Sequence, residues 1–250
     1  VRYKQTVIGI AWAVLQPLLT MVVFTLIFGR VAGMEAEVAA PYAVMTFVAL
    51  LPWQFFSNAI TMSSNSLIMS QNMITKVYFP RIIIPTSSVL SGVIDFLVAF
   101  LILIGMIVWY VAKGEMSVDP VRLLGIPLFF GLCIIAAMGV GLWMSALNVK
   151  YRDVKYVVPF FVRMGLFVSP VGFSSNTIYG SDKIPSILKT LYGLNPMVGV
   201  IDGFRWSIIG GDEFTPHWPI FWISTAMIIL LFISGAVYFR STERTFADTI

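Results

Sequence analysis

The sequence predicts an all-α membrane protein with six transmembrane helices, cytoplasmic amphipathic helices and two short external re-entrant helices. Hydrophobic residues make up 58% of the 250 residues and charged residues only 11%, against about 45–50% and about 25% in soluble domains. The charges also cluster between apolar runs that are long enough to cross about 30 Å of hydrocarbon. Since no internal repeat or soluble segment interrupts this pattern, we expect residues 1–250 to form a single membrane domain.

Six apolar stretches of suitable length define the expected spans. They are residues 11–29, 42–62, 82–112, 121–147, 154–173 and 218–239. Each span is expected to be helical because a segment in lipid must satisfy its backbone polar groups internally. The runs are also much longer than the strands of a membrane barrel.

A charged turn at residues 148–155 indicates how these spans are oriented. It places Lys150, Arg152 and Lys155 between two predicted spans, and short basic loops lie on the cytoplasmic side. With both termini on that side, nine Lys and Arg residues fall inside, six fall outside and Arg163 lies within a span. Orientation therefore explains the net charge of +4. Nucleic-acid binding would need one clustered basic face, and these cations are scattered.

Two cytoplasmic segments have an amphipathic pattern. In residues 63–78, Leu67 and Ile74 recur at near-helical spacing among serines and asparagines, which predicts a short helix at the membrane face. A solvated extension of the second span is the alternative. Residues 1–10 combine cations with apolar residues and are typical of a helix in the interface plane, or of an ordinary basic flank.

The external region 174–217 contains two apolar segments, Ile184–Leu194 and Met197–Ile209, that are too short to cross a membrane. They are typical of re-entrant or interfacial helices. Asn195 and Pro196 separate them, because the residue before proline avoids helix and proline suits the first turn of the next one.

Four charges have positions that call for a partner. Asp202 and Arg205 are three residues apart on one helix face, so we expect them to pair, with a passing ligand as the alternative. Asp95 and Arg163 lie inside predicted spans, where an unpaired charge costs about 2.5–3.5 kcal/mol. We expect that they pair with each other or that Arg163 faces an aqueous path.

The sequence gives little support to catalysis or metal binding. It offers one histidine, His217 beside Trp218, where an interfacial anchor is expected, and one cysteine, Cys133, within an apolar run. No metal site is predicted. A P-loop is also absent, so any ATP must be bound by another subunit.

Aromatic residues form groups that could carry sugars, since ring faces can stack on the C–H faces of a sugar. The grouped rings are Trp53, Phe55, Phe56, Trp143, Phe160, Phe161 and Phe167. An aromatic belt or simple packing is the alternative for any single ring.

Several short motifs occur in order along the chain. They are RYKQT at residues 2–6, LPW at 51–53, FFSN at 55–58, KVYFPR at 76–81, LNVKYRD at 147–153, SPV at 169–171 and LNPM at 194–197. Together they resemble the permease subunit of ABC-2 type polysaccharide exporters over nearly the whole chain. That family moves O-antigen, capsule and teichoic acid chains.

The resemblance implies a homodimeric transporter subunit in the bacterial cytoplasmic (inner) membrane, with both termini cytoplasmic. It further implies a lipid-linked glycan as cargo and two copies of an ABC ATPase subunit that bind ATP and Mg²⁺, so that this chain needs no cofactor of its own. Lipid is the other expected contact, and no nucleic acid is expected.

The resemblance also implies roles for particular residues. Contacts to the ATPase map onto residues 1–10, the coupling segment 63–78 and the turn after the fourth span, with Arg2, Tyr3, Lys4, Asn65, Asn72, Lys76, Lys150, Tyr151, Arg152 and Asp153. An external gate maps onto residues 174–217, with Asn195, Pro196, Asp202 and Arg205. For the glycan channel we expect the grouped rings together with Arg163.

Two other function classes stay open. One is a membrane-embedded transferase acting on lipid-linked sugars, for which Asp202, Glu213 and His217 would be the residues to test. The other is an exporter of small hydrophobic compounds.

Overall fold

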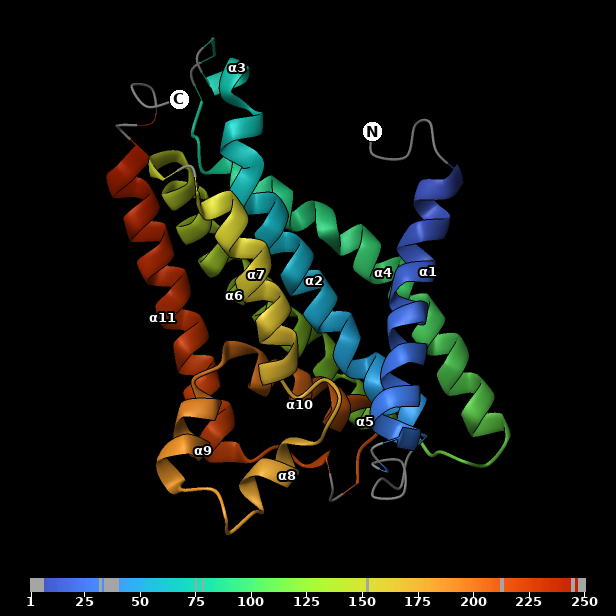
Figure 1. Cartoon of the computed structure of the whole chain (residues 1–250). Helices are drawn as coiled ribbons and strands as arrows, with labels where there is room; N and C mark the ends of the chain where they lie inside the picture. The colour runs from blue at the N-terminus through green and yellow to red at the C-terminus, as the bar shows by residue number, and fades with distance from the viewer. Residues whose placement is uncertain are drawn as a thin grey trace.

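The computed structural model describes residues 7–31, 33, 41–74, 76–77, 79–151, 153–211, 214–243 and 246, and for residues 7–14 the backbone alone. Within these residues every regular element is a helix, as predicted. The long helices run between two ends of the molecule (Figure 1). We name these the α3 end, after α3 (Gln71–Ile74), and the α9 end, after α9 (Ser186–Gly193).

Of the helices that the structure describes, four are long and apolar enough to cross a membrane, by length and composition. They are α2 (Tyr42–Met69), α4 (Ile83–Ala112), α6 (Gly125–Lys150, directly after the single turn α5, Pro120–Leu123) and α11 (Trp218–Thr242). The shortest has 25 residues, about 37 Å at 1.5 Å per residue. The chain is thus a multi-pass membrane protein, and four of the six predicted spans are helices of sufficient length.

The first predicted span lies within a continuous helix made of α1 (Val7–Phe24) and the π-helical segment η1 (Thr25–Val31). One stripe of this helix packs on the core, through Leu18, Met21, Phe24 and Phe28. The other faces are apolar and exposed, including Leu19, Val23 and Ile27. The start of α1 and the end of α11 both lie at the α3 end (Figure 1).

The fifth predicted span is shorter than expected. Helix α7 (Val154–Val168) has 15 residues, about 22 Å, whereas the apolar run extends to residue 173. The helix ends because Ser169 precedes Pro170 and is extended, with φ −88° and ψ 153°. Val171 and Gly172, which were expected in the span, lie buried in the following loop.

Helix α2 lies at the centre of the bundle. In its most apolar window 78% of residues are buried, against 22–28% in α4, α6 and α11, and α2 packs on α1, α4, α6, α7 and α10. It also continues unbroken to Met69, so residues 63–69 extend the second span, and only α3 forms a separate turn in the predicted helix 63–78. Burial of Ser63, Ser64 and Leu67 against neighbouring helices explains this extension.

Three short helices form the α9 end: α8 (Ser175–Tyr179), α9 and α10 (Pro196–Ile208). Both segments predicted to form external helices are helical, but their surroundings differ. Helix α9 exposes Ile187, Leu188 and Leu191. Helix α10 is largely buried and packs on α2, α6 and α11. The apolar character of α10 therefore reflects burial within the protein.

Candidate functional site

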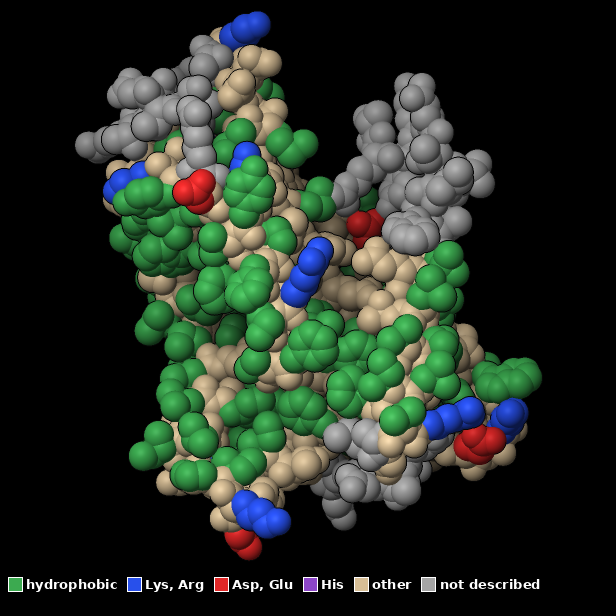
Figure 2. All heavy atoms as spheres, viewed as in Figure 1, with side chains coloured by type: hydrophobic (Ala, Val, Ile, Leu, Met, Phe, Trp, Pro, Cys, Tyr) green, Lys and Arg blue, Asp and Glu red, His purple; other side chains and the backbone are tan. Residues whose placement is uncertain are grey.

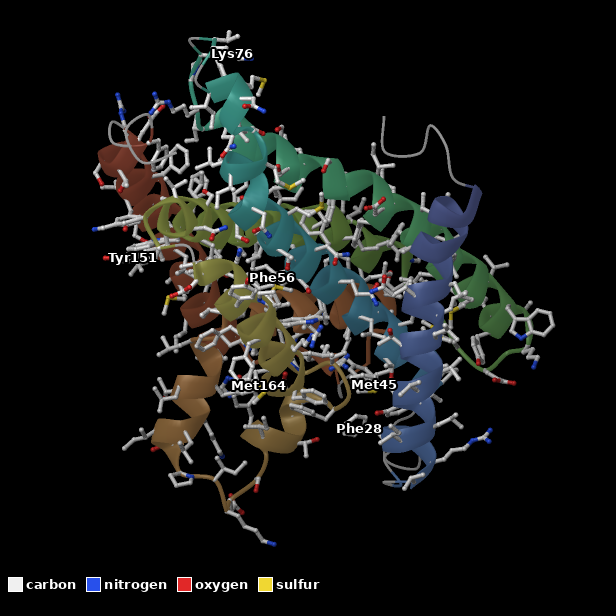
Figure 3. All side chains as sticks on the ribbon, turned by 45° about the horizontal axis from the view of Figure 1, so that its top comes forward. Phe28, Met45, Phe56, Lys76, Tyr151 and Met164 are labelled. Carbon is white, nitrogen blue, oxygen red and sulfur yellow. The ribbon has the colours of Figure 1, made fainter. Side chains whose placement is uncertain are left out.

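Two of the three segments expected to contact an ATPase, the one around α3 and the turn after α6, lie at the α3 end. Asn72 and Lys76 are exposed at and after α3, and Lys150, Tyr151 and Asp153 are exposed around the end of α6. Figure 3 labels Lys76 and Tyr151. Arg2, Tyr3, Lys4 and Arg152 lie outside the described residues, as does the amphipathic stretch 1–6.

Asn148 joins these two segments beneath the surface. It is fully buried in the last turn of α6, and its Nδ2 donates to Ser64 O at 2.8 Å and to Asn65 Oδ1 at 3.2 Å on α2. An apolar cluster continues the contact, formed by Leu67, Ile74, Ile84, Leu142, Ala146, Val149, Phe239 and Phe246. The predicted contact residue Asn65 is therefore part of a joint between α2 and α6.

Replacing Asn148 by leucine is expected to weaken this joint. Two hydrogen bonds are lost and Asn65 Oδ1 loses a donor, which lowers the free energy of unfolding by about 1–3 kcal/mol. Thermal unfolding of the purified protein in detergent measures the change. Asn58→Leu, at an exposed position of α2, is the matched control and should stay within about 0.5 kcal/mol. Equal shifts in both variants would contradict a joint at Asn148.

A third link at the α3 end joins the charged residues Arg81 and Glu243. The backbone N–H of Arg81 donates to Glu243 Oε1 at 3.2 Å, and its guanidinium donates to Glu243 O. These bonds fasten the segment before α4 to the last turn of α11.

At the α9 end, the predicted gate residues Asn195 and Pro196 hold α10 in place. Asn195 Oδ1 accepts from Met197 N at 3.0 Å as the helix N-cap, with Pro196 in the first turn as predicted. Asn195 Nδ2 donates to Ser169 Oγ at 2.9 Å. Ser224 of α11 donates to Asn195 O and Pro196 O at 3.0 Å. The dipeptide thus connects α10 to the end of α7 and to α11.

Arg205 supports the loop that follows α7. Its side chain is only 1% exposed, and it donates to Phe173 O at 2.7 Å and to Val171 O at 2.9 Å. The hydroxyl of Tyr42 donates to Gly172 O in the same loop. Three successive carbonyls of this loop are therefore bound by side chains from α10 and α2.

Asp202 lies one turn before Arg205 and accepts a hydrogen bond from Ser175 Oγ at 2.7 Å. The two charges lie on the same face of α10 as predicted, each with further partners of its own. They share a small polar recess whose walls are Ser174, Ser175, Asn176, Asp202, Arg205, Phe214 and Thr215.

Burial raises the pKa of Asp202 to about 6, although the charge of Arg205 and the hydrogen bond from Ser175 oppose this shift. Burial and the Asp202 charge also raise the pKa of Tyr179 and Tyr192. Since the folded pKa of Asp202 exceeds its ordinary value of 3.8, the folded protein holds this proton more tightly than the unfolded chain.

The free energy of unfolding should therefore fall as the pH rises from about 4 to about 6, by up to about 3 kcal/mol from Asp202 alone. Above about pH 6 this contribution should change little. We expect Asp202→Asn to remove this part of the pH dependence. Thermal unfolding from pH 4 to pH 8 measures both proteins. An Asp202→Asn variant with the slope of the unsubstituted protein would show that another group titrates.

The sequence profile of the ABC-2 type transporter family matches residues 1–209. The chain belongs to this family. Two proteins of Klebsiella pneumoniae named O-antigen export system permease protein RfbA are each 28% identical over 250 residues, which is 100% of this chain and 90% of theirs. A Myxococcus xanthus protein of the same name is 26% identical over 249 residues, with the same coverage. The similarity thus extends along the full chain.

In this ABC-2 family member the rings expected in a channel occupy two kinds of position. Trp53, Phe55 and Phe56 are 6%, 4% and 7% exposed and lie in the core of the helix bundle. Trp143 is partly buried, and its ring stacks on that of Tyr238 with the centroids 4.3 Å apart. Its Nε1 donates to Ser234 Oγ at 3.1 Å. These four rings pack helices together.

The other predicted channel residues, Phe160, Phe161, Arg163 and Phe167, are exposed on α7. Figure 2 shows hydrophobic side chains over the middle of the face in view, with most of the Lys and Arg side chains toward the two ends of the molecule. Asp95 is partly buried on α4. Arg163 is exposed in the isolated chain, and an aqueous path beside it stays a prediction.

Sequence reasoning missed the close helix contacts made by glycine. A β-carbon on Gly139 of α6 would lie 2.7 Å from Phe232 N of α11, and one on Gly235 would overlap Gly139 O. On α10, Gly199 and Gly203 face Ser224 and the ring of Phe129. The spacing of small residues four apart on α10 is the signal that could have revealed its contact face.

Among the described residues no group of three or more His, Cys, Asp and Glu side chains could hold a metal ion. Cys133 is buried, and its thiol donates to Pro52 O at 3.4 Å. His217 is exposed and its ring lies 5.3 Å from that of Tyr179.

Proposed function

We propose that this chain is the membrane subunit of an ATP-driven exporter that moves a lipid-linked polysaccharide of the O-antigen type across the bacterial cytoplasmic membrane. The observation that carries this proposal is the full-length similarity to O-antigen export permeases, within the ABC-2 family. Export of capsule or teichoic acid chains by the same mechanism is the alternative.

In this proposal the chain crosses the membrane six times. Helices α2, α4, α6 and α11 provide four crossings, α1 with η1 provides a fifth, and α7 with the buried loop 169–173 provides the sixth. The α3 end is then cytoplasmic, in agreement with the basic turn after α6. At the other face α9 and α10 form the external gate, with α9 at the interface and α10 inside the protein.

Two copies of the chain would enclose the path, because a glycan is too wide for the interior of this closely packed bundle. An isologous dimer provides two walls from one surface. The exposed apolar face of α1 suits such an interface or contact with lipid, and the exposed face of α7, which carries Arg163, would line the path. Two ATPase subunits would dock on residues 63–78 and 150–155, which the Asn148 joint connects.

ATP-driven closure of the ATPase subunits can then reach the membrane as a rigid-body movement. Because α2 and α6 are joined at the α3 end, force on either segment moves both helices. Helix α2 packs directly on α7 and α10, so the same movement can change the channel face and the external gate. For this to occur, the conformations of the membrane subunit before and after the movement must differ in their contacts to the ATPase.

Co-purification with a nucleotide-binding subunit, followed by ATP hydrolysis in lipid discs, tests the proposal. We expect lipid-linked glycan to stimulate hydrolysis and small hydrophobic compounds to leave it unchanged. The reverse preference would favour an exporter of small compounds. Chemical modification of the glycan by the purified chain, lost on substitution of Asp202, Glu213 or His217, would favour a transferase.

A further inference from the structure

Helix α7 exposes a stripe of three rings with one cation among them. The residues are Tyr156, Phe160, Arg163 and Phe167, spaced four, three and four apart, so they lie within one narrow face of the helix. The three rings are 71%, 61% and 61% exposed. The opposite face packs on α2 and α6 through Val158, Val162 and Gly165, the last against Trp53.

Arg163 makes no hydrogen bond, ion pair or ring contact with another residue in the part of the chain that the structure describes. By contrast, Lys113, Lys150 and Lys155 each lie over a neighbouring ring. Arg163 is the tenth of 15 residues of α7, about 13 Å along the axis from its start. Its position is therefore well inside α7, away from the charged turn that precedes the helix.

An arginine at this depth cannot face hydrocarbon without a large cost, at least about 2.5–3.5 kcal/mol. The stripe must accordingly face an aqueous path or a polar partner. Rings on the same face offer flat surfaces for sugar C–H groups, while the guanidinium offers paired donors in a fork that matches carboxylate or phosphate oxygens.

We propose that Arg163 binds an anionic group of the exported glycan, either the phosphate that joins the glycan to its lipid or a carboxylate on its sugars. This inference rests on the proposed function and adds the class of substrate group that the path selects. Charge complementarity favours an anion over a neutral sugar, because a neutral hydroxyl leaves the charge of Arg163 uncompensated. The rings of Phe160 and Phe167 would then hold the adjoining sugars, whereas the ring of Tyr156 already has Lys155 over it.

The test uses the complete complex of this chain and its ATPase subunits in discs of zwitterionic lipid. Three probes share one oligosaccharide: a polyprenyl diphosphate-linked form with neutral sugars, a form joined to the lipid by an uncharged bond, and an uncharged-bond form that carries uronic acids. The concentration of probe that gives half-maximal ATP hydrolysis is measured for the unsubstituted chain, Arg163→Gln and Arg163→Lys.

For Arg163→Gln we expect the half-maximal concentration of an anionic probe to rise about tenfold or more, because a charge-assisted hydrogen bond is lost. The half-maximal concentration of the uncharged probe should rise less than about twofold. A rise for the diphosphate probe alone identifies the link phosphate, and a rise for the uronic acid probe alone identifies a carboxylate. Arg163→Lys should keep part of the affinity, because the charge remains and the fork is lost. Lys113→Gln, an exposed cation at the end of α4, is the control and should shift no probe.

Equal shifts for charged and uncharged probes, or no shift with any probe, would overturn the inference. So would a shift seen only when the discs contain phosphatidylglycerol, because the anion would then be a lipid headgroup. If no probe stimulated the unsubstituted complex, the proposed function itself would fail. Unfolding temperatures of both Arg163 variants separate a binding defect from misfolding.

Discussion

Replacing Gly235 by valine is expected to separate α11 from α6 and to prevent stable folding. A β-carbon at Gly235 would overlap the carbonyl oxygen of Gly139 and lie 3.0 Å from the ring of Trp143. Backbone atoms cannot rotate away as a side chain can, so the helices must move apart along their whole contact. We expect a loss of about 3 kcal/mol or more, at the upper end for overpacking.

The measurement is thermal unfolding in detergent, together with the yield of monodisperse protein. Gly131→Ala on α6 is the matched control, because nothing lies within 4 Å of a β-carbon there. That change should be neutral or should stabilise by several tenths of a kcal/mol, since alanine loses less chain entropy than glycine. A Gly235→Val protein as stable as Gly131→Ala would show that α6 and α11 do not meet this closely.

Replacing Arg205 by methionine is expected to release the loop that follows α7. The carbonyl oxygens of Val171 and Phe173 lose their donors, and Asp202 loses the neighbouring positive charge that lowers its pKa. Leaving buried acceptors and a carboxylate without this partner should reduce the free energy of unfolding by about 3–5 kcal/mol. Unfolding temperature and protease cleavage within residues 169–174 measure the effect.

Arg122→Met provides the comparison at the same end of the molecule. Arg122 pairs with Asp119 at 3.5 Å, and the two side chains are 36% and 49% exposed. Exposed pairs of this kind contribute about 0–1 kcal/mol. Similar losses of unfolding free energy in both variants would mean that Arg205 contributes no more than a surface charge does. That result would contradict the role given to its burial and its hydrogen bonds.

Length and hydropathy alone predicted α2, α4, α6 and α11, because these properties depend on local composition. The same reasoning extended the fifth span to residue 173, since Val171, Gly172 and Phe173 are apolar enough for lipid. For residues 63–78 it left both a separate amphipathic helix and an extension of the second span open. Burial of Ser63 and Ser64 against α6 keeps α2 continuous, and hydropathy cannot register a neighbour that is distant in sequence.

For the candidate site, sequence patterns located the exposed residues well and the buried ones poorly. The turn at 148–155 and the dipeptide Asn195–Pro196 were identified from charge and from proline chemistry. Their partners Ser64, Ser169 and Ser224 were not, since an isolated serine carries no pattern of its own. The contact face of α10 could have been predicted from its small residues. The ring that packs on this face, Phe129, could not.

By itself, the sequence determined that this chain is a helical membrane protein, that the turn at residues 148–155 is basic, and which family the chain resembles. These conclusions follow from composition and from short motifs, which act locally. The tertiary structure alone decided that Val171 and Gly172 lie buried in a loop after α7, that Arg205 supports this loop, and that Arg163 projects from an exposed face of rings. Contacts such as that between Tyr42 and Gly172, 130 residues apart, set these features, because side chains so distant along the chain meet only when the helices pack.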